Sequence, residues 1–412
     1  MKYGLIGEKL THSFSKEIHN LLGGYDYELC ELKENELDTF FKKKDFCGIN
    51  VTIPYKTSVI KYLDCIDDTA QQIGAVNTVV NKDGKLFGYN TDAFGLSSLI
   101  RKYGVDIRNK KVLILGGGGT SKTALFVAQK LGAKCVIRVS RTEKEGFVTY
   151  TEARELHTDA NVLINTTPVG MYPDTEKSPI DISEFNRLEA VFDAIYNPLN
   201  SRLILAARQR GIIAAGGLYM LVAQAYKSAE LFSGKSIDES LIDKTYKQVL
   251  NSRRNIVLIG MPSSGKSTIG GILSNLLKMP LFDTDEHIFK MTGKTPADII
   301  NREGEAAFRR IESKVIADIS VKNHCIIATG GGAVTVDGNI IRLKANGKVY
   351  YIDRPVDLLK STPDRPLSSS AEALKNLYDK RKDLYNNAAD LTVKNDADIN
   401  TTAEIIRKDF LL

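Results

Sequence analysis

Short apolar runs recur along the chain, and longer segments of mixed polarity separate them. Near the start, the runs KYGLIG, CGINVTI and NTVVN alternate with helix-type segments up to about Asn90. Apolar runs bounded by turn residues are typical of buried strands, and their alternation with helical segments is typical of an α/β fold. The pattern therefore predicts a first α/β unit, followed by a long helix from about Asp92 to Tyr103.

A second unit of the same class follows this helix. Three apolar runs occupy residues 134–141, 160–168 and 190–198, and each ends in turn-forming residues. A parallel doubly wound sheet requires strands of this kind. The spacing of Ser236 and Glu239 is that of a capping box and predicts that another helix begins here. Its apolar positions fall on one face and are Ile242, Tyr246, Val249 and Leu250.

A polar stretch from Ser252 to Asn255 is the natural boundary after this helix. An independent βα pattern runs from Ile256 to Leu412. At 412 residues the chain has room for about three compact units.

Two glycine loops of different design follow apolar strands. The first, KVLILGGGGTSK at residues 111–122, has the tight glycine turn of a dinucleotide fold. A structural turn before a helix is the alternative, but the next strand ends in Ser140-Arg141-Thr142, and a basic residue there suits a ribose 2′-phosphate. The sequence therefore favours NADP(H) as the cofactor. The residues expected to bind it are Gly116, Gly118, Gly119, Thr120, Ser121, Ser140, Arg141 and Thr142.

The second loop, IVLIGMPSSGKST at residues 256–268, has the GxxxxGK[ST] spacing that cradles phosphates. Lys266 would reach the terminal phosphates of ATP, and the Ser267 hydroxyl would bind Mg²⁺. Asp283 and Asp285 alternate at the end of the next strand, so one can hold the metal while the other faces an acceptor hydroxyl. The loop residues expected at ATP are Gly260, Ser263, Ser264, Gly265, Lys266, Ser267 and Thr268.

Composition excludes several classes of protein. The 56 basic and 50 acidic residues give a net charge of +6, spread along the chain, so nucleic acid is not required as a partner. The five cysteines lie far apart without a C-x-x-C pair, which argues against a disulfide framework or a zinc site and fits a reducing cytoplasm. No signal-peptide core and no apolar run of ~18 residues appear, so we expect a cytoplasmic protein without membrane contact. The oligomeric state stays open, with a homodimer as one alternative.

A series of motifs in the first 250 residues resembles the shikimate dehydrogenase family. In chain order these motifs are HSFS, NVTIPYK, GAVNTV, GYNTDAFG, INTTPVGM, the run Asp193 to Pro198, and GGLYMLVAQA. The resemblance implies NADPH-dependent reduction of 3-dehydroshikimate to shikimate, with Lys56 and Asp92 as the catalytic pair. A surface lysine and a helix N-cap aspartate are the alternative for these two residues. The residues implied at the substrate are Ser13, Ser15, Thr52, Asn77, Tyr196 and Gln224, with Gly217 implied at the cofactor.

Taken without the family, Ser13 and Ser15 would point to one side of an extended segment and could grip a single carboxylate or hydroxyl group. Two positions depart from the family pattern. Lys16 stands where proline is usual, and Glu145 stands where a basic residue is usual. The second departure predicts only a moderate preference for NADP over NAD.

The second half resembles shikimate kinase through its phosphate loop and through LFDTDEHI, FRRIE, ATGGGAV, DRPL and RKDLY, in that order. This implies phosphorylation of shikimate by MgATP, with Asp285 orienting the attacking 3-hydroxyl. The resemblance also places Arg309 and Arg381 at the carboxylate, the Gly331 and Gly332 amides at the ring hydroxyls, Arg365 of a lid at the phosphates, and Asp283 with Ser267 at the metal.

The two implied reactions are consecutive steps toward chorismate. The expected fold is α/β throughout. The expected domains are a substrate-binding domain at 1–102, a Rossmann-type NADP-binding domain at 103–235, and a P-loop kinase domain at 253–412, with C-terminal helices to about 251 packing back on the dehydrogenase. Two alternatives remain. The first is a non-catalytic nucleotide-dependent regulator, which would predict loss of the catalytic residues. The second is quinate oxidation joined to phosphorylation of another hydroxy acid.

Overall fold

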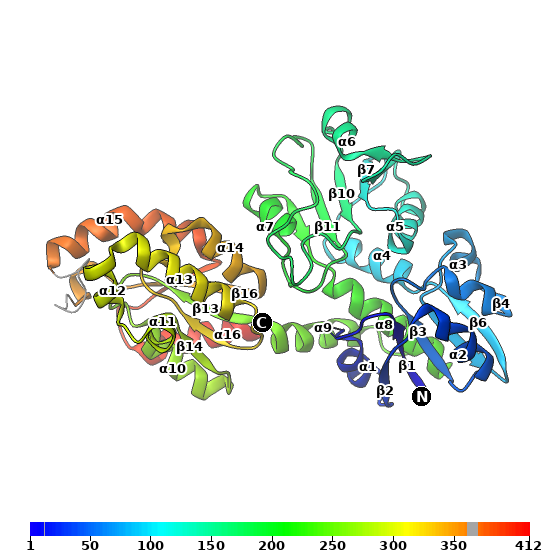
Figure 1. Cartoon of the computed structure of the whole chain (residues 1–412), viewed down its shortest axis with the longest axis horizontal. Coiled ribbons are helices and arrows are strands. Elements are labelled where there is room, and N and C mark those ends of the chain that lie inside the picture. The colour runs from blue at the N-terminus through cyan, green and yellow to red at the C-terminus, as the bar shows by residue number, and fades with distance from the viewer. Residues whose placement is uncertain (12, 361–369) are drawn as a thin grey trace. The chain divides into compact units, whose positions relative to one another are not determined.

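The structure is a computed structural model that describes residues 1–11, 13–360 and 370–412. It separates into two compact units, Met1–Val249 and Leu250–Leu412 (Figure 1). The first unit holds two sheets and the second holds one. No helix within the described ranges is long and apolar enough to cross a membrane.

The first sheet has the strand order β2-β1-β3-β5-β6-β4, with antiparallel pairing of β3 to β5 and of β5 to β6. Its strands are β1 (Tyr3–Gly7), β2 (Tyr27–Glu31), β3 (Gly48–Val51), β4 (Cys65–Ile66), β5 (Thr78–Lys82) and β6 (Lys85–Tyr89). Its helices are α1 (Ser15–Gly23), α2 (Leu37–Lys43) and α3 (Asp68–Ile73), with short 3-10 helices η1 (Glu34–Glu36) and η2 (Ser58–Tyr62). Ile6, Ile49 and Val79 of three neighbouring strands are fully buried in one hydrophobic core, which fixes the sheet's inner face.

The second sheet is parallel throughout, in the order β12-β11-β10-β7-β8-β9. Its strands are β7 (Lys111–Leu115), β8 (Cys135–Ser140), β9 (Val148–Thr149), β10 (Val162–Asn165), β11 (Ala190–Asp193) and β12 (Ile213–Ala215). Helix α4 (Asp92–Lys102) leads into it, and α5 (Gly119–Lys130), α6 (Tyr150–Leu156) and α7 (Arg202–Gln209) belong to it. The sheet lies between α5 and α7 (Figure 1). The predicted doubly wound sheet and the helix that precedes it are confirmed.

Two helices end the first unit, α8 (Leu218–Ser233) and α9 (Ser240–Arg253). Helix α8 packs along α4 and α1, so it returns the chain to the first sheet. The predicted capping box at Ser236 is wrong. Helix α9 begins at Ser240, and the Asp238 side chain accepts the Ser240 N–H at 3.0 Å.

The polar stretch predicted as a boundary is not a loop. Its first two residues end α9, and Asn255 opens a strand. Asn255 is buried, and its amide side chain is satisfied by hydrogen bonds to two backbone segments. Its Nδ2 donates to the Lys322 carbonyl at 2.6 Å, and its Oδ1 accepts the Cys325 N–H at 3.0 Å. Asn255 therefore stabilises the start of β13 through these hydrogen bonds and does not mark a linker.

The second unit is built on a parallel sheet in the order β14-β15-β13-β16-β17. Its strands are β13 (Asn255–Ile259), β14 (Leu281–Asp283), β15 (Ile326–Ala328), β16 (Gly347–Asp353) and β17 (Leu391–Lys394). Its helices are α10 (Lys266–Leu277), α11 (Thr284–Thr292), α12 (Pro296–Glu303), α13 (Glu305–Ser320), α14 (Asp337–Asn346), α15 (Ala371–Ala388) and α16 (Ile399–Leu411), with 3-10 helices η3 (Ala333–Thr335) and η4 (Val356–Leu358).

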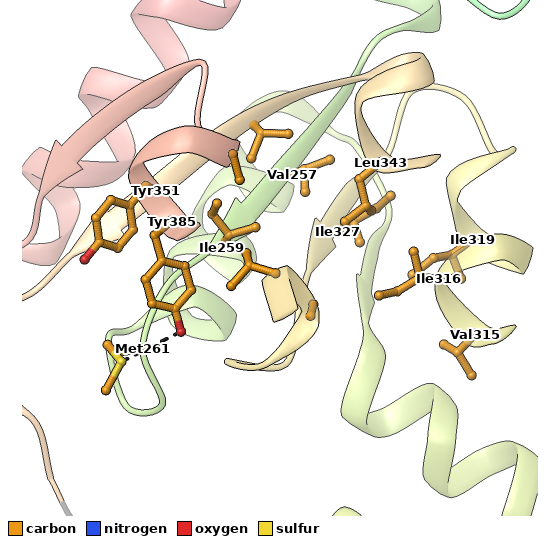
Figure 2. Close-up of a cluster of buried hydrophobic side chains, with 14 of the residues drawn as sticks. Val257, Ile259, Met261, Val315, Ile316, Ile319, Ile327, Leu343, Tyr351 and Tyr385 are labelled. Carbon is orange, nitrogen blue, oxygen red and sulfur yellow. Dashed lines mark hydrogen bonds between the residues drawn. The ribbon is translucent and has the colours of Figure 1, made fainter. Parts of the chain in front are cut away.

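The central strand β13 is apolar at every position after Asn255 because both of its faces are covered. Val257 and Ile259 point into a core shared with α13, α14 and α15 (Figure 2). Ile256 and Leu258 point the other way, into a core formed with α10 and α16. This two-sided burial fixes the end of β13, from which the phosphate loop leaves.

Candidate active sites

Lys56 and Asp92 form a short ion pair in the first unit. Lys56 follows β3, and Asp92 is the first residue of α4. Lys56 Nζ lies 2.5 Å from Asp92 Oδ2, and the two side chains are only 14% and 8% exposed. The other carboxylate oxygen, Oδ1, accepts a hydrogen bond from Asn77 Nδ2 at 2.9 Å. Both oxygens of Asp92 therefore have donors, which fixes the direction in which Lys56 is held.

Gln224 joins this group from far along the chain. It lies on α8, and its Oε1 accepts hydrogen bonds from Asn77 Nδ2 and from the Thr91 hydroxyl, each at 3.3 Å. Its own amide donates to the Leu221 carbonyl at 3.0 Å. The structure thus brings together Lys56, Asp92, Asn77 and Gln224, which the sequence placed in separate motifs.

A buried polar network continues from this group and was missed by the sequence reasoning. Asn50 Nδ2 donates to the Ser228 hydroxyl at 2.8 Å, and Asn50 Oδ1 accepts from the Tyr27 hydroxyl at 2.7 Å. Ser228 also lies 3.0 Å from the Thr91 hydroxyl. The signal that could have found Ser228 is its spacing, since it lies four residues after Gln224 and therefore on the same helix face.

The serine pair does not have the predicted extended geometry. Ser15 begins α1, and its N–H donates to the Ser13 hydroxyl at 3.2 Å. Phe14 between them has helical backbone angles (φ −91°, ψ −1°), so the segment is not extended and the geometric argument was wrong. The residue between them, Phe14, packs edge-on against Tyr196 with ring centroids 5.0 Å apart. His12 of the same motif lies outside the described residues.

Two further predicted residues are fixed by their neighbours. Thr52 donates its N–H to the Ile6 carbonyl at 3.0 Å, and its methyl group packs on Gly7, where a Cβ would lie 2.6 Å away. Tyr196 is half-buried, and burial raises the pKa of its hydroxyl. Tyr196 is therefore a neutral donor at ordinary pH.

The dinucleotide loop lies next to the ion pair. Gly116 has φ +111°, and a Cβ there would lie 2.7 Å from Thr166 Oγ1, so only glycine fits. A Cβ at Gly118 would meet no described atom within 4 Å, which leaves this turn open to a ligand. A Cβ at Gly119 would lie 3.4 Å from Lys56 Cβ. The first turn of α5, which also contains Thr120 and the buried Ser121, therefore starts beside Lys56.

Two cations close in sequence to the predicted cofactor residues, Arg138 and Lys144, share one aromatic ring. Arg141 and Thr142 are exposed, and the Thr142 N–H donates to the Ser140 hydroxyl at 3.4 Å. Phe147 was missed. The Arg138 guanidinium lies 4.1 Å and the Lys144 ammonium 5.0 Å from the centre of its ring. These contacts place two cations on the Phe147 ring, and that ring lies 3.4 Å from where a Cβ would stand at Gly117 of the dinucleotide loop.

Asp193 and Gly217 shape the turn that carries Tyr196. Asp193 is buried and accepts hydrogen bonds from Asn165 Nδ2 at 2.9 Å, the Ile195 N–H at 3.0 Å and the Ser201 hydroxyl at 2.5 Å. Burial raises the pKa of Asp193 to about 6 in spite of these donors. Gly217 donates its N–H to the Ile195 carbonyl at 2.7 Å, and a Cβ there would collide with the Ala194 carbonyl.

The phosphate loop of the second unit turns through left-handed backbone at Gly260 (φ +149°), Ser263 (φ +62°) and Gly265 (φ +96°). Lys266 Nζ donates to the carbonyls of Gly260 at 3.0 Å and Met261 at 2.8 Å. Ser264 is buried, and its carbonyl accepts from Asn395 Nδ2 at 2.8 Å, a support that the sequence did not reveal.

Ser267 and Asp283 lie together beside this loop. The Ser267 hydroxyl donates to Asp283 Oδ2 at 2.6 Å, and Thr268 next to it is exposed. Asp285 does not alternate with Asp283 on a strand, as the sequence predicted. Asp283 is the N-cap of α11 and accepts the Asp285 N–H at 2.9 Å, so Asp285 lies in the first helical turn. This correction reflects the preference of aspartate for helix N-caps.

Two predicted arginines meet at one glutamate in the second unit. Arg309 Nη2 lies 3.0 Å and Arg381 Nη2 3.9 Å from Glu305 Oε1, which the sequence reasoning missed. Arg309 Nη1 also pairs with the fully buried Glu312 at 2.6 Å. Burial raises the pKa of Glu312, the guanidinium of Arg309 opposes this, and Asp285 raises the pKa further.

A glycine turn brings these groups together. A Cβ at Gly330 would lie 2.5 Å from Glu312 Oε1 and 3.2 Å from Asp285 Oδ1. A Cβ at Gly332 would collide with the Arg309 guanidinium. Arg381 Nη1 donates to the Gly331 carbonyl at 3.2 Å. Arg365 lies outside the described residues.

The site residues and sheets together define two enzymes in one chain, an oxidoreductase with a dinucleotide loop and a kinase with a phosphate loop. A family model for the shikimate dehydrogenase substrate binding domain matches residues 5–79, and one for shikimate kinase matches residues 262–409. Both resemblances drawn from the sequence are confirmed.

Relatives agree with the first of these matches. The shikimate dehydrogenase (NADP(+)) of Clostridium beijerinckii is 38% identical over 263 residues, covering 59% of this chain and 96% of the relative. A chorismate mutase/shikimate 5-dehydrogenase fusion protein from Clostridium acetobutylicum is 37% identical, with a TM-score of 0.56 over 60% of this chain and 96% of that chain. A shikimate 5-dehydrogenase from Thermus thermophilus, solved in complex with NADP(H) and shikimate, is 29% identical, with a TM-score of 0.54 over 60% of this chain and 99% of that chain.

The chain belongs to the shikimate dehydrogenase family over its N-terminal 60% and carries a shikimate kinase domain after it. It is a bifunctional enzyme of the shikimate pathway.

Proposed function

We propose that the first unit reduces 3-dehydroshikimate to shikimate with NADPH, and that the second phosphorylates the 3-hydroxyl of shikimate with MgATP. The observation that carries the first half is the Lys56–Asp92 pair held beside Gly119. An ammonium group next to a dinucleotide loop is suited to a reaction in which a ketone oxygen gains a proton.

NADPH, when bound, would supply the hydride to carbon 3 of the substrate. Lys56 Nζ would give its proton to the ketone oxygen, and Asp92 would hold the ammonium group in line and take part in its reprotonation. A hydride on carbon and a proton on oxygen convert the ketone to the hydroxyl, so the step balances. Asn77 keeps Asp92 in place through its 2.9 Å hydrogen bond.

The remaining groups of the first site would hold the ring and the cofactor. We assign the carboxylate and hydroxyls of the substrate to Ser13, Ser15, Thr52, Asn77 and Gln224, with Tyr196 near the nicotinamide. The open turn at Gly118 and the glycine-only conformation at Gly116 fit a dinucleotide. NADP rather than NAD is supported by Arg141, by the positive charge gathered at Phe147, and by relatives named for NADP(+).

MgATP, when bound, would supply the phosphoryl group in the second unit. Lys266 and the loop amides from Gly260 to Thr268 would hold the phosphates, and Ser267 with Asp283 would hold the metal. Their 2.6 Å contact supports this, because adjacent hydroxyl and carboxylate oxygens are ligands that Mg²⁺ prefers. We assign contact with the phosphates to Arg365 from its place in the family pattern.

Shikimate would enter through an exchange of ion pairs. Glu305 is 45% exposed, so its pairing with Arg309 and Arg381 is weak and the substrate carboxylate can replace it. Glu312 is fully buried and would keep Arg309 oriented during the exchange. Asp285 would then orient the 3-hydroxyl and take its proton.

Substrate discrimination tests this proposal. The purified chain is assayed with 3-dehydroshikimate and NADPH, with quinate and NAD, and with shikimate and MgATP. We expect turnover in the first and third assays and weak or no turnover in the second. Faster oxidation of quinate than reduction of 3-dehydroshikimate, or no phosphorylation of shikimate, would favour a different substrate for that unit.

A further inference from the structure

The carbonyl of Gly331 receives two donors from α15. Tyr385 donates its hydroxyl to this oxygen, and Arg381 Nη1 donates to it at 3.2 Å. The sequence grouped both residues in one motif, but a role was assigned only to Arg381. Tyr385 is fully buried, so its hydroxyl needs a partner, and it has taken a backbone carbonyl beside the acceptor groups.

Two hydrogen bonds hold the Gly331 carbonyl in one direction, and this also fixes the direction of the Gly332 N–H. The peptide between Gly331 and Gly332 is planar and is not among the cis bonds of the chain. In a trans peptide the C=O and the following N–H point in opposite directions, so holding the Gly331 carbonyl toward Tyr385 directs the Gly332 N–H away from it. Gly332 lies against the Arg309 guanidinium, so this peptide belongs to the acceptor side.

Tyr385 also reaches the phosphate loop. Its hydroxyl oxygen lies 3.7 Å from Met261 Sδ (Figure 2). Gly331 itself packs on the next residue of that loop, since a Cβ there would lie 2.7 Å from Pro262 Cδ. One hydroxyl therefore touches both the loop expected at ATP and the turn expected at shikimate.

The ring of Tyr385 is held independently of its hydroxyl. It stacks on Tyr351 with centroids 5.0 Å apart and planes 17° apart (Figure 2). Burial raises the pKa of Tyr385 to about 12, so it stays a protonated donor at any working pH. Removal of the oxygen alone would leave the ring packed in the core.

We propose that Tyr385 is a positioning residue of the kinase reaction that aims the Gly332 amide at the acceptor and sets the acceptor turn against the phosphate loop. This inference rests on the proposed phosphorylation of shikimate. It predicts that the hydroxyl governs the use of shikimate more than the use of ATP, because the ring alone maintains the packing.

The test is Tyr385→Phe in the full chain, with Tyr351→Phe as the matched control. Tyr351 is the stacked neighbour, but its hydroxyl donates to Asp353 Oδ1 at 3.1 Å and not to the acceptor turn. Kinase kcat and the KM values for shikimate and ATP are measured, along with Tm and the dehydrogenase rate as a measure of intact protein.

We expect Tyr385→Phe to raise the KM for shikimate about three- to tenfold, the scale of one lost hydrogen bond, and the KM for ATP less than about twofold. Tyr351→Phe should change neither KM beyond about twofold. An unchanged KM for shikimate, or an equal rise in both KM values, would overturn the positioning role. A wild type unable to phosphorylate shikimate would instead overturn the proposed function, and this inference with it.

Discussion

Lys56→Met should abolish ketone reduction while leaving the kinase unit intact. Methionine keeps most of the side-chain length but cannot donate a proton, and proton transfer by a positioned side chain contributes about 10²- to 10⁴-fold to a rate. In activation free energy this is about 3–5 kcal/mol. Dehydrogenase kcat should fall by at least about 100-fold, and kinase kcat should change less than about twofold because its groups lie in the other unit.

Lys56→Met should also lower the free energy of unfolding of the first unit, and this effect is separate from the loss of catalysis. The Lys56–Asp92 pair is 14% and 8% exposed, and breaking a buried pair costs about 3–5 kcal/mol. We expect the low end, about 3 kcal/mol, because Asn77 still donates to Asp92 at 2.9 Å. Urea unfolding of the first unit, followed alongside NADPH oxidation, measures both effects on one sample.

Lys102→Met is the matched control. Lys102 Nζ also lies 2.5 Å from an aspartate, Asp243, but these side chains are 32% and 58% exposed. Such a pair contributes about 0–1 kcal/mol, so this variant should stay active and nearly as stable as the wild type. Retention of more than a tenth of the dehydrogenase rate by Lys56→Met, or an equal loss in Lys102→Met, would refute the reasoning.

Four other predictions can be checked with standard assays. Asp285→Asn should lower kinase kcat by about 10²-fold while ATP still binds in calorimetry, and unchanged turnover would exclude it as the base. Arg141→Ala should weaken NADP about tenfold but NAD little, and equal losses would show a role in the fold alone. Burial raises the folded-state pKa of Asp193 from 3.8 to about 6, so the native state holds this proton more tightly and the wild type should lose stability as pH rises from about 4 to 6. Thermal melts of Asp193→Asn across this range should lack that loss, and a parallel pH dependence in both proteins would contradict the assignment. Residues 1–249 and 250–412, expressed separately, should each fold and keep one activity, and an inactive half restored only by its partner would argue against independent units.

The strands and loops that could be predicted are those marked by a short stretch of sequence, such as an apolar run or a glycine at a turn. Strand β13 is an unbroken apolar run because both of its faces are buried, and the glycines at 116, 260 and 265 stand where the backbone is left-handed. Strand β2 (Tyr27–Glu31) was missed because three of its five residues are exposed, so it lacks an apolar run.

The contacts that could not be predicted join distant parts of the chain. Gln224 meets Asn77 across 147 residues, and Glu305 at the start of α13 lies 3.9 Å from Arg381 of α15. Local chemistry also misled the reading of single residues. Asp285 was placed on a strand although Asp283 caps a helix, and Asn255 was read as part of a polar boundary although its side chain joins two buried backbones.

The central claim is that one chain carries out both reactions, and a one-pot experiment tests it most directly. The protein is incubated with 3-dehydroshikimate, NADPH and MgATP, and the products are followed by mass spectrometry. The wild type should form shikimate 3-phosphate, Lys56→Met should leave the ketone unreduced, and Asp285→Asn should stop at shikimate. A mixture of the two variants should restore the final product. A wild type that forms only shikimate, or forms a phosphorylated ketone without consuming NADPH, would contradict the account.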